Sequence, residues 1–184
     1  MGYRRGFKSE ANSIGAEIRH ELGLGDLDPL NPRYLAGLLE IPIHDLSDLA
    51  QEHPRLQHLL KVEPAAFSAI TVFDGAKRAI VHNDGHHSTR QHSNLTHEIS
   101  HGLLLHPPTP ALDDRGCREW DQNIEDEATW LAGVLLVPET ACLDIARTEI
   151  PRAEAADQYQ VSPQMIQYRL NVTGAMTRVR RMKK

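Results

Sequence analysis

The chain has few cysteines and no long hydrophobic run, and each shortage argues against a class of protein. Cys117 and Cys142 are the only cysteines and form no C-x-x-C pair, so we expect free thiols rather than a structural zinc cluster. No stretch reaches the roughly 20 apolar residues of a transmembrane helix. The N-terminal residues lack the apolar segment of an export signal, so we expect a cytoplasmic protein with no membrane partner.

An excess of basic residues is also missing, because the 184-residue chain has a formal net charge of -5. Such a chain has no general affinity for nucleic acid or for anionic membranes. Residues 177–184 are the exception, since most of them are arginine or lysine. We expect them to form a frayed, solubilising terminus, with contact to an acidic partner or nucleic acid as the alternative.

One five-residue motif carries most of the functional information. It reads His97-Glu98-Ile99-Ser100-His101 and has the form H-E-x-x-H. Residues four apart on a helix share one face, so two imidazoles at this spacing can bind one Zn²⁺ at roughly 2.0–2.1 Å. The glutamate is placed to take a proton from a water on the metal. The motif therefore predicts two metal ligands, His97 and His101, and one catalytic base, Glu98.

The surrounding residues predict a helix over about 89–105. Ser88 and Gln91 have the spacing of a capping box at its start. On a helical wheel, the apolar side chains, among them Leu95 and Ile99, gather opposite the two histidines. One face of the helix can therefore enter a core while the other presents the histidines to a cleft.

A catalytic zinc usually has three protein ligands, and the third is expected on a helix predicted over about 123–137. Glu125 and Glu127 flank the apolar stripe of that helix on opposite sides, so periodicity does not choose between them. Ala128 and Ala132 lie on the Glu125 side, where small residues would allow the close helix approach that a shared metal requires. Their position favours Glu125.

These segments resemble the ImmA/IrrE family of metallo-endopeptidases. That family follows its H-E-x-x-H motif with a second helix of the form E-x-x-A-(N/D) that ends at L-L-x-P. Here HEISHGLLLH, at 97–106, and IEDEATWLAGVLLVPE, at 124–139, carry the resemblance, which extends over most of residues 7–175. One departure is Thr129, which stands where the family has Asn or Asp and would orient a ligand histidine more weakly.

The resemblance implies a zinc-dependent endopeptidase with a defined site. Carried over by position, the metal ligands are His97, His101 and Glu125, and Glu98 is the base. Members of the family act on regulatory proteins, often helix-turn-helix repressors. The resemblance therefore implies a protein substrate of this kind, encoded as a separate chain.

The expected fold is α+β: a single zincin-like, mostly helical domain over residues 1–184 with a small antiparallel sheet. A helical N-terminal part over about 7–60 contains a short edge strand at 41–44. A hairpin over about 67–83 follows, with an Asp-Gly turn. The catalytic helix, the ligand-bearing helix and further helices over about 139–182 complete the domain.

Two other functions stay open on the sequence: a metal-binding regulator that acts without cleavage, and a DNA-binding regulator. Residues 158–170 have the rhythm of a helix-turn-helix, but Arg169 is the only basic residue of its second helix. We therefore expect this segment to pack against the core rather than read DNA. Four side chains are candidates for stabilising a transition-state oxyanion: His87, His106, Tyr159 and Tyr168.

Overall fold

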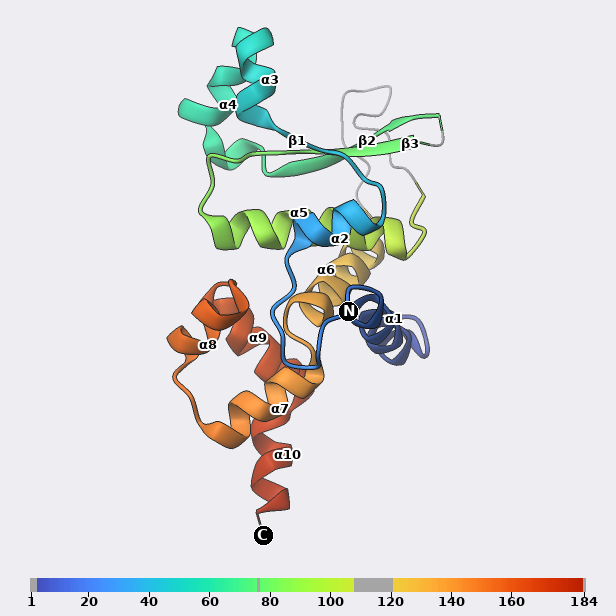
Figure 1. Cartoon of the computed structure of the whole chain (residues 1–184), viewed down its shortest axis with the longest axis vertical. Coiled ribbons are helices and arrows are strands. Elements are labelled where there is room, and N and C mark those ends of the chain that lie inside the picture. Colours follow the sequence, from blue (N-terminus) through green and yellow to red (C-terminus); the bar gives the residue numbers. More distant parts are fainter. Residues whose placement is uncertain (1–2, 76, 108–120, 184) are drawn as a thin grey trace.

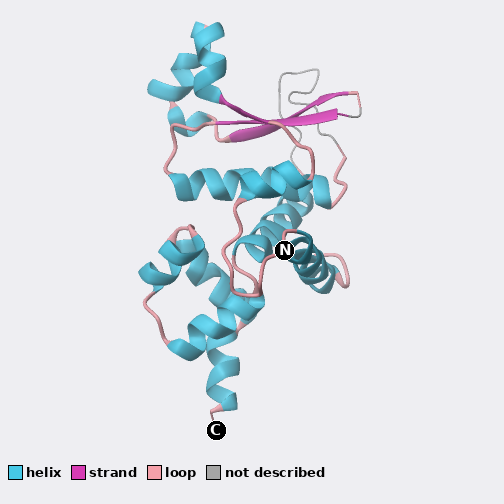
Figure 2. Ribbon diagram, in the orientation of Figure 1, coloured by secondary structure: helices cyan, strands magenta, loops and turns pink. Residues whose placement is uncertain are grey.

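The computed structural model describes residues 3–75, 77–107 and 121–183, and Figures 1 and 2 show a mostly helical molecule with one small sheet. The helices are α1 Phe7–Glu21, α2 Pro32–Leu38, α3 Leu46–Glu52, α4 Gln57–Lys61, α5 Ser88–Leu103, α6 Gln122–Leu136, α7 Glu139–Thr148, α8 Arg152–Tyr159, α9 Pro163–Thr173 and α10 Ala175–Met182. The strands are β1 Ile43–Asp45, β2 Ala69–Asp74 and β3 Lys77–His82. The predicted α+β, zincin-like class is confirmed.

The sheet is mixed rather than purely antiparallel, which corrects one part of the prediction. Its strand order is β1-β3-β2, so β1 and β2 are the edge strands. β2 and β3 form the predicted hairpin, and Gly75 at its turn has a φ of 59°, a left-handed conformation that glycine adopts without strain. β1 pairs in parallel with β3, since α3, α4 and β2 intervene and return the chain to the same end of the sheet.

The helices are arranged around two hydrophobic clusters. α5 runs beneath the sheet, and α6 packs against α5 on the side away from the strands (Figure 1). The first cluster lies between α1, α5, α6 and the sheet, with Phe7, Leu95 and Leu131 fully buried. The second lies within α7 to α10. α6 joins the two, because Leu135 belongs to the first cluster and Leu136 to the second.

α6 is the central helix, and two buried arginines close its C-terminal end. The last carbonyls of a helix have no partner within it, and its dipole places partial negative charge there. Arg19 donates from Nη1 to the Leu135 carbonyl at 3.2 Å, and Arg169 donates from Nε to the Val137 carbonyl at 2.9 Å.

In the described residues no single helix is long and apolar enough to span a bilayer; α6 and α7 meet that description only as a pair, bent by 55°.

The C-terminal helices differ from the expectation of a frayed terminus. α10 packs onto α7 and buries Val179, which is 6% exposed, in the second cluster. Lys183 adds an ion pair to Glu149 at 2.9 Å. Val179 and this ion pair dock α10 against the preceding helices. Arg169 is only 1% exposed, so the sole basic residue of α9 is withheld from any DNA.

The two cysteines are only partly described. Cys142 is a free thiol, fully buried in the second cluster, and burial raises its pKa. A buried thiol with a raised pKa is a poor nucleophile, because the thiolate is the reactive form. Cys117 lies outside the described residues.

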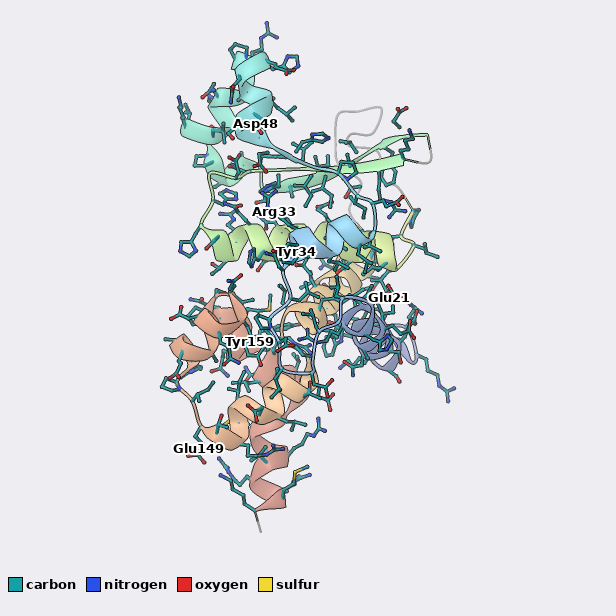
Figure 3. The ribbon with its side chains drawn as sticks, viewed as in Figure 1. Glu21, Arg33, Tyr34, Asp48, Glu149 and Tyr159 are labelled. Atoms are coloured by element: carbon teal, nitrogen blue, oxygen red, sulfur yellow. The ribbon has the colours of Figure 1, made fainter. Side chains whose placement is uncertain are left out.

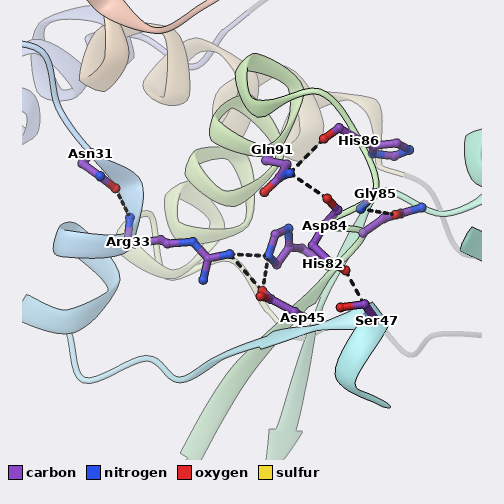
Figure 4. A network of polar contacts seen from close by, with 10 residues as sticks. Asn31, Arg33, Asp45, Ser47, His82, Asp84, Gly85, His86 and Gln91 are labelled. Carbon is purple, nitrogen blue, oxygen red and sulfur yellow. Dashed lines mark hydrogen bonds and ion pairs between the residues drawn. The ribbon is translucent and has the colours of Figure 1, made fainter. Parts of the chain in front are cut away.

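The start of α5 also corrects a prediction. The N-cap is His87, whose Nδ1 accepts from the Thr89 amide at 3.3 Å, and Ser88 is already inside the helix. The proposed capping box with Ser88 at the N-cap is therefore wrong. Gln91 instead donates to the carbonyls of Asp84 and His86 at 2.9 and 2.8 Å, and thereby fastens the loop between β3 and α5 (Figure 4).

A polar network holds the sheet to the helices that flank it. His82 on β3 is fully buried, and its Nε2 lies 2.7 Å from Asp45 Oδ1 on β1 and 2.9 Å from Arg33 Nη2 on α2 (Figure 4). Burial opposes ionisation of Asp45, but hydrogen bonds from Arg33 and His82 outweigh it and lower the pKa of Asp45. The network fixes β3, which a short loop connects to α5.

Candidate metal centre

Three potential ligands converge where α5 meets α6. His97 and His101 lie on successive turns of α5, with their Nε2 atoms 3.0 Å apart. Glu125, in the first turns of α6, places Oε2 at 3.1 Å from His97 Nε2 and Oε1 at 3.8 Å from His101 Nε2. The structure thus brings together the three residues that the sequence singled out as ligands.

The donor set fits a tetrahedral zinc ion. Ligands bound at roughly 2.0–2.1 Å around a tetrahedral centre lie about 3.3 Å from one another. The distances of 3.0, 3.1 and 3.8 Å between the donor atoms bracket that value. The side chains of His97, His101 and Glu125 are 26%, 21% and 19% exposed, so one side of the cluster is open to solvent. Three protein ligands and an open position are typical of a catalytic zinc site.

The charge on Glu125 also suits a metal. The rings of His101 and His97 hold the pKa of the Glu125 carboxyl well below its usual range, against the opposing effect of burial. Glu125 is therefore ionised at neutral pH, which is the form that coordinates a cation.

Glu127 faces a different set of neighbours. One of its oxygens lies 3.2 Å from Arg4 Nε, and the other lies 3.5 Å from His106 Nε2. The choice that helical periodicity left open is thus made by the way α6 packs: it turns Glu125, and not Glu127, towards the histidine pair.

Glu98 points towards the sheet and is held there by a hydrogen bond. The hydroxyl of Thr71, on β2, donates to Glu98 Oε2 at 2.7 Å. A fixed carboxylate on the residue next to a candidate ligand histidine could accept a proton from an attacking water. Thr71 could not be predicted from the sequence, because it belongs to no motif and its contact depends on how the hairpin packs over α5.

Each ligand histidine also has a partner on its other ring nitrogen. His97 Nδ1 lies 3.4 Å from the hydroxyl of the exposed residue Thr129, and His101 Nδ1 lies 3.0 Å from His106 Nδ1. Burial, and then the neighbouring His101, lower the pKa of His106, which keeps that ring uncharged at neutral pH. Such partners orient the ligand rings and decide which nitrogen carries the proton.

The four candidates for an oxyanion donor all have other contacts. His87 caps the start of α5, and His106 lies behind His101, on its Nδ1 side. Tyr159 is 1% exposed and lies inside the C-terminal helices (Figure 3). Tyr168 has a hydrogen-bond interaction with Tyr3. No oxyanion donor is therefore identified in the part of the chain that the structure describes.

Comparison with known families identifies the chain. The family model described as an IrrE N-terminal-like domain, Peptidase_M78, matches residues 60–171. The chain belongs to this family. The match confirms the resemblance stated above and includes both motifs of the metal centre. No curated protein matches the chain. The family is metal-dependent and of the metallopeptidase type, in agreement with the cluster of ligands between α5 and α6.

Proposed function

We propose that the protein is a zinc-dependent endopeptidase that hydrolyses a peptide bond in a regulatory protein of the helix-turn-helix type, encoded as a separate chain. The observation that carries this proposal is the convergence of His97, His101 and Glu125, with Glu98 next to His97 in the sequence, in a chain of the IrrE-like peptidase family. The choice of zinc rests on the donor set, because two imidazoles and a carboxylate with one open position suit this ion.

The residues of the site have separate tasks in this mechanism. His97, His101 and Glu125 hold the metal, which when bound supplies Lewis-acid chemistry and lowers the pKa of water towards ~7. Glu98 accepts the proton of the attacking water and returns it to the leaving amine. Thr71 holds one oxygen of Glu98 at 2.7 Å and so limits the rotation of the base.

The sheet supports the proposal of an extended peptide substrate. β2 is an edge strand, and it carries Thr71 next to the base. A peptide can add to such an edge through main-chain hydrogen bonds, with its side chains alternating between the two faces. A substrate strand on β2 would then run past Glu98 and the metal ligands.

The test is cleavage and capture of the partner with Glu98→Gln. This variant keeps the shape of the side chain but removes the base, so zinc content and fold should persist while cleavage falls by about 10² or more. The variant should also retain the uncleaved partner in a pull-down from the native host, where mass spectrometry identifies it. Glu63→Gln is the matched control, since Glu63 is 64% exposed and lies outside the site.

Two outcomes would count against the mechanism. Cleavage at the wild-type rate by Glu98→Gln would remove Glu98 as the base. A partner that is captured equally by the wild type and the variant, and cut by neither, would favour a regulator that binds without cleavage.

A further inference from the structure

We infer that His106 and Glu127 are positioning residues, which hold His101 in the orientation and tautomer that metal binding requires. This inference rests on the proposed metal centre and adds to it a supporting chain of side chains: Glu127, His106, His101. Neither His106 nor Glu127 is a ligand, and both act through His101.

The geometry aligns the three side chains behind the site. His101 turns Nε2 towards His97 and Glu125, and its Nδ1 lies 3.0 Å from His106 Nδ1. The other nitrogen of His106, Nε2, lies 3.5 Å from Glu127 Oε2. His106 and Glu127 are 9% and 12% exposed, so water has little access to these contacts.

The positions of the protons follow from the ligand role of His101. A neutral imidazole has one N–H and one free lone pair. If Nε2 is to bind a metal, the proton of His101 must be on Nδ1, and it then donates to the lone pair of His106 Nδ1. The proton of His106 is consequently on Nε2, where it faces the carboxylate of Glu127. In this arrangement His101 and His106 share a hydrogen bond, and the buried N–H at His106 Nε2 points at a carboxylate. The 3.5 Å contact with Glu127 is electrostatic, because His106 Nε2 has no hydrogen-bond partner among the described residues.

The backbone supplies an independent reason for the position of His106. α5 ends in a Schellman motif, in which the His106 amide donates to the His101 carbonyl at 3.0 Å and the Leu105 amide donates to the Gly102 carbonyl at 3.1 Å. The motif needs a left-handed residue, and Leu105 occupies that position with a φ of 53° although it is not glycine. This turn folds the chain back so that the ring of His106 meets the ring of His101, with centroids 5.0 Å apart.

Glu127, the member of this series farthest from the metal site, contacts Arg4 in the N-terminal segment. Arg4 Nε lies 3.2 Å from Glu127 Oε1 and 3.4 Å from Oε2, so a cation holds the carboxylate that faces His106. Residue 4 lies outside the matched range 60–171, so this support comes from a part of the chain beyond the family match. By contrast, the partner of His97 Nδ1 among the described residues is the exposed hydroxyl of Thr129, at 3.4 Å. His101 is therefore the better supported of the two ligand histidines.

The experiment measures zinc affinity by competition with a chromophoric chelator, in the full chain and four variants. His106→Phe keeps a ring but removes both nitrogens, and we expect it to weaken zinc binding by about 10- to 100-fold, as loss of such a partner typically does. His106→Gln retains an oxygen that can accept from His101, so it should recover part of the loss. Glu127→Gln should weaken binding by less than about 10-fold, because the contact it removes is long and one step further out.

The matched control is His58→Phe. His58 Nε2 also lies 3.5 Å from a glutamate oxygen, that of Glu63, but this pair is exposed and belongs to α4 and the turn after it. His58→Phe should therefore leave zinc affinity unchanged. Wild-type affinity in both His106 variants would overturn the inference.

A second readout needs no metal. Nitrogen-15 NMR of the metal-free wild-type protein at pH 8 should show the proton of His101 on Nδ1, and His106→Phe should lose that preference. A wild-type His101 that carries its proton on Nε2 would contradict the chain of contacts. If the wild type binds no zinc, the proposed function fails, whereas the tautomer of His101 still decides this inference separately.

Discussion

Substitutions of Thr129 test how strongly the contact with His97 contributes to zinc affinity. The Thr129 hydroxyl lies 3.4 Å from His97 Nδ1, beyond the usual 2.7–3.2 Å of an N–H···O hydrogen bond, and the side chain is exposed, so water competes for the same nitrogen. A well-formed partner of a ligand histidine contributes about 10- to 100-fold in metal affinity. We therefore expect Thr129→Val, which removes only the hydroxyl, to weaken zinc binding by less than about 10-fold, or ~1.4 kcal/mol.

The opposite change should strengthen the site. Thr129→Asn introduces the residue type that the resemblance to the family's second motif implies at this position, and its carbonyl oxygen extends one bond further from the backbone than the threonine hydroxyl. We expect zinc affinity to rise by up to about 10-fold. Competition titration of both variants is the assay, with Thr148→Val as control because that hydroxyl bonds only the Asp144 carbonyl of its own helix. A loss of 100-fold or more in Thr129→Val, or weaker binding in Thr129→Asn, would refute this reasoning.

Two further predictions concern stability, and both are read by urea denaturation. Val179→Ala removes two buried carbon atoms at ~0.8 kcal/mol each and leaves a cavity, so it should cost roughly 2 kcal/mol; no change would mean that α10 is not docked. Asp45→Asn should destabilise the protein at pH 7. The pKa of Asp45 is lowered from 3.8 on folding, so its contribution is present above about pH 4 and lost as the pH falls through the folded value. An equal difference between variant and wild type at pH 7 and pH 2 would contradict the role of the network.

The parts of the fold that could be predicted are those that depend on short-range sequence patterns, such as motif spacing, apolar periodicity and turn residues. The H-E-x-x-H spacing and the apolar stripe located α5 and its two faces, and Leu95 and Ile99 are buried as expected. The Asp-Gly turn located the hairpin. The parallel pairing of β1 could not be read, because it depends on a crossover between segments that are far apart in the chain.

The outer parts of the metal centre were the least predictable. Nothing local marks Thr71, and helical periodicity marked Glu127 only as an alternative ligand, because both contacts depend on which helix or strand packs beside them. His106 was a candidate from the sequence, but as a hydrogen-bond donor to a transition-state oxyanion. Its position behind His101 follows from a left-handed turn at Leu105, a conformation that a leucine does not suggest. Arg169 likewise could not be predicted to be buried, because its partner is the Val137 carbonyl at the end of α6, far away in the sequence.

The most direct test of the metal centre is X-ray absorption spectroscopy of the zinc-loaded protein. We expect a first shell of nitrogen and oxygen at ~2.0–2.1 Å, with outer-shell scattering from two imidazole rings and no sulfur. In Glu125→Ala the two-ring signature should persist while one oxygen is lost or replaced by solvent. A sulfur shell at ~2.3 Å, or a spectrum with fewer than two imidazoles in the wild type, would contradict binding by His97, His101 and Glu125.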